Sequence, residues 1–111
     1  LNRIIEVFFR LSLKFRDNGD KVIRLYRRVV RLLTISSNDK LLGYTPEMIR
    51  EYLVKRRGVE LGGLIDLFEK TCFGGYVPDE SEWKMIYAGY KAQWKKLTKR
   101  EKTTLELDKN M

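Results

Sequence analysis

The sequence has no histidine, a single cysteine and only two prolines. Without histidine the chain cannot build a Ser-His-Asp triad, a Cys-His dyad, an HExxH zinc site or a histidine pH switch. One cysteine, Cys72, excludes an intramolecular disulfide and a thiolate metal cluster, which fits a reducing compartment. The chain also lacks a signal peptide and any apolar run of the roughly eighteen residues that a transmembrane helix needs. We therefore expect no cofactor and no metal.

The composition is that of a folded, basic protein. Of its 111 residues, 43% are hydrophobic and 12% aromatic, which is enough to build the core of one domain. Lys and Arg number 23 against 15 Asp and Glu, and the net charge of +8 attracts nucleic acid or anionic membranes. The abundance of Lys and Glu favours a thermophilic source such as an archaeon. Because the chain starts at Leu1, directly in an apolar helical pattern, we expect it to be a piece of a longer protein.

The spacing of the apolar residues predicts an all-α fold, a bundle of about five helices. Apolar residues recur at helical intervals over 1–16, 21–35, 45–57, 60–73 and 78–97, and no segment alternates as a strand would. Three parts follow from this pattern. They are an apolar N-terminal helix over 1–16, a four-helix bundle domain over 20–98, and a charged tail over 99–111 that we expect to be mobile.

Residues with capping preferences mark most of the helix limits. Short polar side chains favour the N-terminus of a helix, proline its first position, and glycine its C-terminus. We expect Asp20 to cap the second helix. The third helix should begin at Thr45 and Pro46 and end at Gly58, and the fourth should end at the Gly74-Gly75 pair.

The first helix has very little polar surface. Its charged residues, Arg3, Glu6, Arg10 and Lys14, fall on one narrow stripe, and most of the remaining surface is apolar. Such a helix must lie beneath other elements of its own domain, contact a second copy of the chain in a homodimer, or lie against a membrane. It is shorter than the roughly twenty residues that span a bilayer. The sequence leaves these three arrangements open.

The second helix carries the strongest candidate binding face. Its apolar residues lie on one half of the helix and its arginines on the other, with Lys21 alongside. A concentrated basic face attracts phosphates of nucleic acid or of an anionic membrane, although the same pattern also describes a solvated helix face. Because the arginines lie opposite the apolar half, we expect their replacement by Gln to leave the fold intact. The candidate anion-binding residues are Lys21, Arg24, Arg27, Arg28 and Arg31.

The aromatic residues of the last helix predict core packing rather than a platform for base stacking. The large side chains there follow the helical period: Trp83, Ile86, Tyr87, Tyr90, Trp94 and Leu97. Cys72 also lies on an apolar helix face and should be a buried thiol. The carboxylates occupy ordinary surface positions of helices and no motif joins them, so we predict that the chain is not an enzyme.

Three segments together resemble a known family of helical domains of unknown function. They are DKVIRLYRRVVRLL, GYTPEMIREYL and LIDLFEKTCFGGYVPDESEWKMIYAGYKAQWKKL, and they cover about residues 20–98. Members of that family typically sit at the C-terminus of membrane-anchored proteins, commonly ones that carry a transglutaminase-like domain. Beside Arg27 and Arg28, the matching positions are Tyr26, Thr45, Pro46, Glu51, Tyr52, Phe73, Gly74 and Gly75.

The resemblance implies a cytosolic domain tethered behind a transmembrane segment, with no catalytic residues to carry over. Where the family leads us to expect a basic linker, before Asp20, this chain has an apolar helix. Our first hypothesis is a non-enzymatic juxtamembrane interaction module on the cytoplasmic side of a membrane, whose basic face meets anionic lipid and whose other face binds an unknown protein partner. The alternative is a soluble nucleic-acid-binding helical domain that uses the same arginines. Nucleic acid is disfavoured because no helix-turn-helix spacing, RNA-binding aromatic motif or zinc finger accompanies them.

Overall fold

Helices make up most of the described chain. The structure is a computed structural model that describes residues 2–14, 16–37, 41 and 43–99. Within these ranges every regular element is helical, which confirms the predicted all-α fold. The elements are α1 (Asn2–Leu13), α2 (Asn18–Ser37), α3 (Pro46–Tyr52), η1 (Leu53–Arg57), α4 (Gly62–Gly74) and α5 (Glu80–Thr98), of which η1 is a wider π-helical turn that continues α3. The predicted mobile tail lies, apart from Lys99, outside the described residues.

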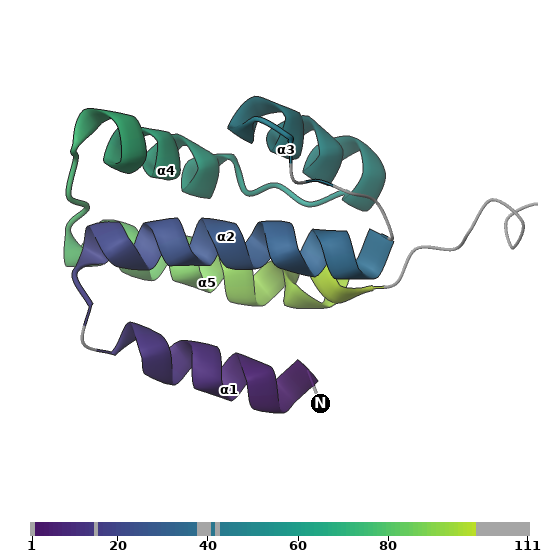
Figure 1. Cartoon of the computed structure of the whole chain (residues 1–111), viewed down its shortest axis with the longest axis horizontal. Coiled ribbons are helices and arrows are strands. Elements are labelled where there is room, and N and C mark those ends of the chain that lie inside the picture. Colours follow the sequence, from purple (N-terminus) through teal and green to yellow (C-terminus); the bar gives the residue numbers. More distant parts are fainter. Residues whose placement is uncertain (1, 15, 38–40, 42, 100–111) are drawn as a thin grey trace, which may run out of the picture.

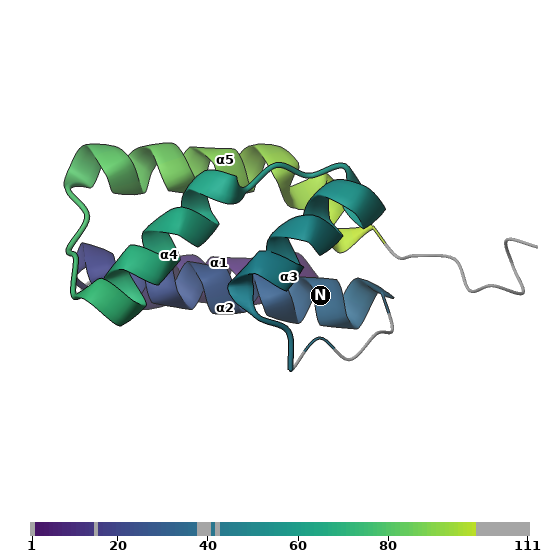
Figure 2. The same ribbon diagram turned by 90° about the horizontal axis from the view of Figure 1, so that it is seen from above.

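The helix α2 lies at the centre of the bundle. Figure 1 shows α3 and α4 on one side of the α2–α5 pair and α1 on the other. Seen from above, α4 crosses α2 and α5 at an angle and lies beside α3 (Figure 2). Because α2 packs closely against both α4 and α5, it joins the two larger layers, and α1 is added on the side away from α4.

The core forms where the apolar half of α2 meets α3, α4 and α5. Four residues of α2 are at most 1% exposed, and they are Val22, Leu25, Val29 and Leu33. The aromatic stripe of α5 packs into the same core, as predicted. Its buried members are Trp83, Tyr90 and Leu97, and its partly buried members are Ile86, Tyr87 and Trp94.

The helix α2 begins before its predicted cap. The Asp17 side chain, through Oδ1, accepts a hydrogen bond from the backbone N–H of Asp20 at 2.7 Å, so the prediction of Asp20 as the N-cap was wrong. The earlier start is accommodated by Gly19, which is buried against α4 and has no side chain to displace that helix. Asp20 instead accepts hydrogen bonds from Arg16 and Arg24, and the bond from Arg16 holds the pKa of its carboxyl below the usual range.

The last turn of α4 lies outside the core. Cys72 is exposed, which corrects the prediction of a buried thiol. All residues over 72–77 are exposed, and the Phe73 side chain is 76% exposed. The apolar spacing of α4 continues into this turn, but none of the described helices covers it, so the spacing alone gave the wrong burial.

Two adjacent glycines at the end of α4 have opposite conformational needs. Gly75 is the C-cap and has a φ of 68°, in the left-handed region, whereas Gly74 is the last helical residue. We expect Gly75→Ala to lower the free energy of unfolding by about 1 kcal/mol, because a Cβ atom disfavours this backbone conformation. Gly74→Ala should raise it by roughly 0.5 kcal/mol, because alanine favours the helix and no atom lies within 4 Å of the added Cβ. Thermal unfolding of the two variants tests this, and shifts of the same sign would contradict it.

A single guanidinium group closes the end of the bundle where α2 and α5 finish. Arg57, the last residue of η1, donates through Nη1 to the carbonyls of Lys96 and Lys99 and through Nη2 to Ser36 Oγ at 2.6 Å. Ser36 in turn donates to the carbonyl of Leu97 at 3.1 Å. The guanidinium therefore donates hydrogen bonds to carbonyl groups at the end of α5, where the last turn of a helix has no intrahelical donors for its carbonyls.

Candidate functional site

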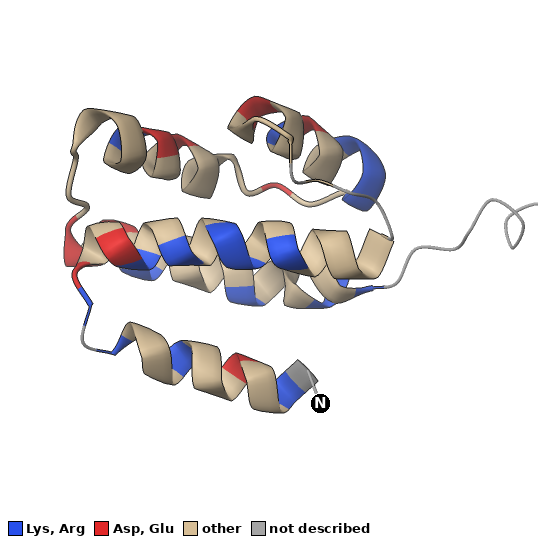
Figure 3. Ribbon diagram, in the orientation of Figure 1, with Lys and Arg blue, Asp and Glu red and all other residues tan. Residues whose placement is uncertain are grey.

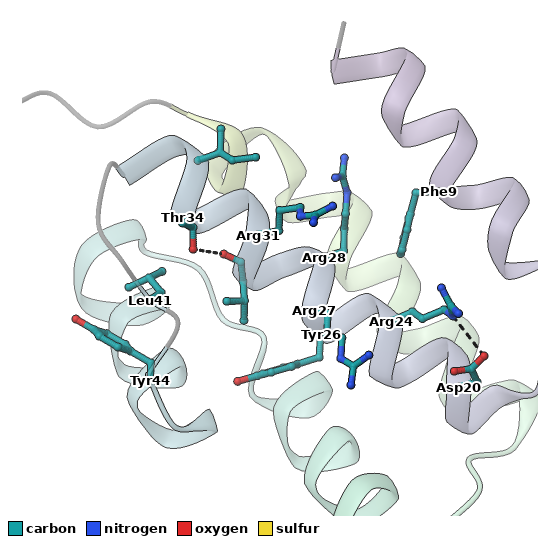
Figure 4. A pocket seen from close by; sticks show the side chains of 12 residues that line it. Phe9, Asp20, Arg24, Tyr26, Arg27, Arg28, Arg31, Thr34, Leu41 and Tyr44 are labelled. Carbon is teal, nitrogen blue, oxygen red and sulfur yellow. Dashed lines mark hydrogen bonds and ion pairs between the residues drawn. The ribbon is translucent and has the colours of Figure 1, made fainter.

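An open groove runs along the solvent side of α2. Its volume is about 1080 Å³, and in Figure 4 it lies between Phe9 of α1 on one side and Tyr44, just before α3, on the other. The arginines of the predicted basic face all line it, namely Arg24, Arg27, Arg28 and Arg31. The view in Figure 3 shows how basic residues recur along this side of α2. The other lining residues are Phe9, Asp20, Tyr26, Val30, Thr34, Ile35, Leu41 and Tyr44, so the groove combines cationic groups with apolar walls.

The arginines of the groove are not equivalent. Arg24 donates through Nε to Asp20 Oδ2 at 3.3 Å, and the Arg28 charge is likewise matched by a carboxylate. Arg27 and Arg31 are exposed, and no hydrogen bond or ion pair joins them to other residues in the described part of the chain. Two of the four positive charges are therefore already compensated, and two can meet an anion from solvent.

The side chain of Arg28 is largely buried, so the expectation that all four arginines lie on an accessible face opposite the core does not hold for Arg28. Its side chain is 9% exposed, because α1 packs over it, and its guanidinium lies 5.7 Å from the centroid of the Phe9 ring. The Arg28 Nε atom is buried and has no hydrogen-bond partner among the residues that the structure describes. Arg28 therefore has a structural role that Arg27 and Arg31 lack.

Lys21 does not line the groove. Its Nζ atom lies 5.6 Å from the centroid of the Trp83 ring, on the side of α2 that faces α5. The structure thus separates Lys21 from the arginines with which the sequence grouped it, because the helical spacing placed it only at the margin of their face.

A buried carboxylate fastens α1 to the rest of the bundle. Glu6 Oε2 accepts hydrogen bonds from Arg28 Nη2 and from Trp94 Nε1, both at 3.2 Å, and Glu6 Oε1 accepts one from Tyr90 Oη at 2.7 Å. Burial, and then the neighbouring carboxylate, raise the pKa of the Tyr90 phenol well above its usual value. Glu6 is 6% exposed, so three donors from two helices bind one carboxylate that has little contact with solvent.

As a consequence, α1 packs on the bundle with most of its apolar side facing solvent. The inward side of the helix holds Glu6, Phe9 and Leu13, and Phe9 and Leu13 pack on the core. The outward side is a strip of large apolar residues that are 45–66% exposed, and these are Ile4, Ile5, Val7, Phe8 and Leu11. Of the three arrangements left open by the sequence, the structure thus combines contact with the chain's own bundle and an apolar face that the bundle does not cover.

A second, smaller groove lies on the other side of α1. Its volume is about 350 Å³, and it separates α1 from α5. Its lining residues are Arg3, Glu6, Val7, Arg10, Tyr90, Lys91 and Trp94. Open space on both sides of the helix means that α1 rests on the bundle through a narrow line of contacts around Glu6.

Comparison of this chain with family models, with curated proteins and with solved structures gave no match. In the part of the chain that the structure describes, no helix combines the length and apolar character needed to cross a membrane. Nor do three or more acidic or cysteine side chains gather there in a way that could hold a metal ion.

The residues that match the resembled family are spread over the fold and do not form one site. Those described first pack against another helix or cap one. Tyr26 stacks on Phe68 of α4 with 3.9 Å between the ring centroids, and Thr45 Oγ1 accepts a hydrogen bond from the Met48 N–H at 3.2 Å. Beside Arg27 and Arg28, only Tyr26 among these positions lines the groove. Pro46 lies in the first turn of α3. Further along the same segment, Glu51 is exposed and Tyr52 is buried. The exposed end of α4 is formed by Phe73, Gly74 and Gly75.

Sequence reasoning missed Glu6 and Phe9 as residues that shape this site. Phe9 was one of many apolar residues on the first helix, and nothing in its spacing distinguishes it from Phe8. Glu6 did carry a signal, because it is the only acid on a stripe that otherwise holds Arg3, Arg10 and Lys14. A lone acid on an otherwise basic stripe is a natural partner for an arginine that becomes buried.

Proposed function

We propose that this chain is a non-enzymatic interaction module at the cytosolic surface of an anionic membrane, within a larger membrane-anchored protein. In this proposal the α2 groove meets the phosphate groups of lipid headgroups, and another face of the bundle holds a protein partner, as the resemblance over residues 20–98 implies. The observation that carries the proposal is that Arg27 and Arg31 have no hydrogen-bond or ion-pair partner among the described residues and line an open groove whose other two arginines are each paired with a carboxylate.

The distribution of charge supports an anionic partner for this side of the molecule. Residues 1–40 hold ten Lys and Arg against four Asp and Glu, a net +6 of the total +8. Guanidinium groups form strong hydrogen bonds to phosphate oxygens.

The same arginines could instead meet the phosphates of a nucleic acid. The apolar walls of the groove and the outward apolar strip of α1 favour lipid, because a sugar-phosphate backbone offers little apolar surface to cover them. Base recognition would also require side chains placed to reach base edges. A competition experiment separates the two partners.

Neutralising Arg27 and Arg31 should weaken binding to anionic vesicles. The test is flotation of the full chain on vesicles of phosphatidylglycerol and phosphatidylcholine in equal parts, at low salt. We expect Arg27→Gln/Arg31→Gln to bind about 30-fold more weakly, because each cation near an anionic surface contributes about 1 kcal/mol. The variant should unfold at the wild-type temperature, since both side chains are exposed.

The matched control is Lys84→Gln/Lys95→Gln, which removes the same charge from exposed positions on α5. It should bind clearly better than the arginine variant. Equal binding by the two variants would show that net charge alone drives association and that the groove has no special part. If duplex DNA displaced the wild-type protein from the vesicles, the nucleic-acid alternative would take the place of this proposal.

A further inference from the structure

The helix α1 turns Glu6 toward the bundle and most of its apolar surface toward solvent. Its one acidic residue, Glu6, is buried and hydrogen-bonded to three donors. The outward strip is centred on Ile4, Phe8 and Leu11, which are 59%, 66% and 58% exposed. A helix in contact with water normally has the reverse arrangement. The strip is therefore suited to a surface that is itself apolar.

Positive charge flanks this strip on two sides, from α1 itself along one edge and from the arginines of α2 beyond the other. Arg3, Arg10 and Lys14 recur along one edge at helical spacing, next to Val7, and all three are exposed. Past the other edge, Phe9 of α1 forms the rim of the arginine groove. Because Glu6 is buried, no acidic side chain of α1 is exposed within the described residues. An apolar centre between two cationic borders matches a helix that lies in the interface of an anionic bilayer.

We propose that α1 is an in-plane membrane anchor whose apolar strip enters the boundary between the headgroups and acyl chains of an anionic bilayer. The inference rests on the proposed function, since it takes the same membrane as the partner, and it adds a hydrophobic contribution to the electrostatic one. The cationic side chains at the edges have long apolar stems, which allow the charged ends to reach the phosphates while the strip goes deeper. The hydrogen bonds of Glu6 to Arg28, Tyr90 and Trp94 hold the helix so that the strip faces away from the bundle.

Charge also distinguishes the bilayer from a second copy of the chain as the occupant. In a symmetric dimer the same patch is used on both subunits, so the cationic edges of the two α1 helices, formed by Arg3, Arg10 and Lys14, would be brought close together without an exposed acid on either helix among the described residues. A bilayer that contains anionic lipid offers an apolar interior and negative charge at its surface. The bilayer therefore satisfies both parts of the patch, whereas a second copy satisfies only the apolar part.

The two contributions can be separated by salt. At about 1 M salt the Debye length is about 3 Å, so binding through exposed charges is largely screened while apolar insertion persists. We expect the wild-type chain to remain bound at this salt to vesicles of phosphatidylglycerol and phosphatidylcholine in equal parts. Ile4→Gln/Phe8→Gln should reduce the salt-resistant binding at least about tenfold, because it removes two apolar side chains from the strip. The same variant should still bind at low salt through the arginine groove.

A matched control removes equally exposed apolar side chains from another part of the surface. Phe73 and Val77 are 76% and 65% exposed, at the end of α4, and α4 lies across the bundle from α1 (Figure 1). Phe73→Gln/Val77→Gln should bind like the wild-type chain at both salt concentrations. The Arg27→Gln/Arg31→Gln variant should show the complementary pattern. It should bind more weakly than the wild-type chain at low salt and about as well as the wild-type chain at high salt.

Each outcome decides the proposal. Loss of low-salt binding in the arginine variant together with full salt-resistant binding in Ile4→Gln/Phe8→Gln would overturn the anchor and leave the proposed function standing. Complete release of the wild-type chain at about 1 M salt would also overturn it. A wild-type dimer that becomes a monomer in Ile4→Gln/Phe8→Gln, with unchanged flotation, would assign the strip to a second copy. Circular dichroism should show the wild-type helical signal in the variant, since both replaced side chains are exposed.

Discussion

Glu6→Ala is expected to lower the free energy of unfolding by about 3 kcal/mol, the largest effect that we predict for any residue of α1. The substitution leaves the Arg28 charge buried without its carboxylate and deprives Tyr90 Oη and Trp94 Nε1 of their acceptor. Thermal unfolding followed by circular dichroism should show a midpoint lower by roughly 10 °C or more. A variant as stable as the wild-type chain would show that α1 does not dock through Glu6.

Two further variants identify the cause of that loss. Glu6→Gln keeps the shape and one acceptor oxygen but removes the negative charge, so its stability should lie between those of the wild-type chain and Glu6→Ala. Glu6→Ala/Arg28→Met removes both charges and fills the place of the arginine stem with an apolar chain, and it should be more stable than Glu6→Ala alone. If the double variant were the least stable of the three, the buried charge of Arg28 would not be the source of the effect.

Leu25→Ala should destabilise the bundle by about 3 kcal/mol, within the usual range for a buried leucine. Leu25 is 0% exposed and lies on the central helix α2, which packs against both α4 and α5. Truncation would leave a cavity between these helices, because a core assembled from three elements cannot close fully around one missing side chain. Equilibrium unfolding by urea measures the change in free energy.

The control for this prediction lies on the same helix. Ile35 is also a large aliphatic residue of α2, but its side chain is 68% exposed, so Ile35→Ala should change the free energy of unfolding by less than about 0.5 kcal/mol. Similar losses for Leu25→Ala and Ile35→Ala would contradict the placement of the core on the α4 and α5 side of α2.

The helices could be predicted because apolar spacing and capping residues act locally. The period of Val22, Leu25, Val29 and Leu33 defines one face of α2 whatever packs against it. Thr45 and Gly58 then mark the ends of the α3–η1 segment through preferences of their own backbone and side chain. These predictions required no knowledge of which helices are neighbours.

Burial of Glu6 and exposure of Cys72 could not be predicted in this way, because both depend on which element lies nearby. Spacing assigns charged residues to solvent, yet Arg28 and Glu6 neutralise one another across two helices and are buried together. Spacing likewise assigns Cys72 to the apolar face of α4, although no helix in the described part of the chain covers the last turn there. The four arginines were correctly placed on one face, but only the packing of α1 shows that Arg28 differs from Arg27 and Arg31.

The hydrogen bonds of Arg57 have a consequence for amide exchange at the end of the bundle. Terminal turns of helices ordinarily open one at a time, with small opening free energies. Here the last turns of α2 and α5 share one guanidinium, through Ser36 Oγ and through the carbonyls of Lys96 and Lys99. Opening either turn alone would break bonds that also hold the other. The backbone amides of these two turns should therefore exchange with solvent deuterium at similar rates, as one cooperative unit, although the turns are some sixty residues apart in the sequence.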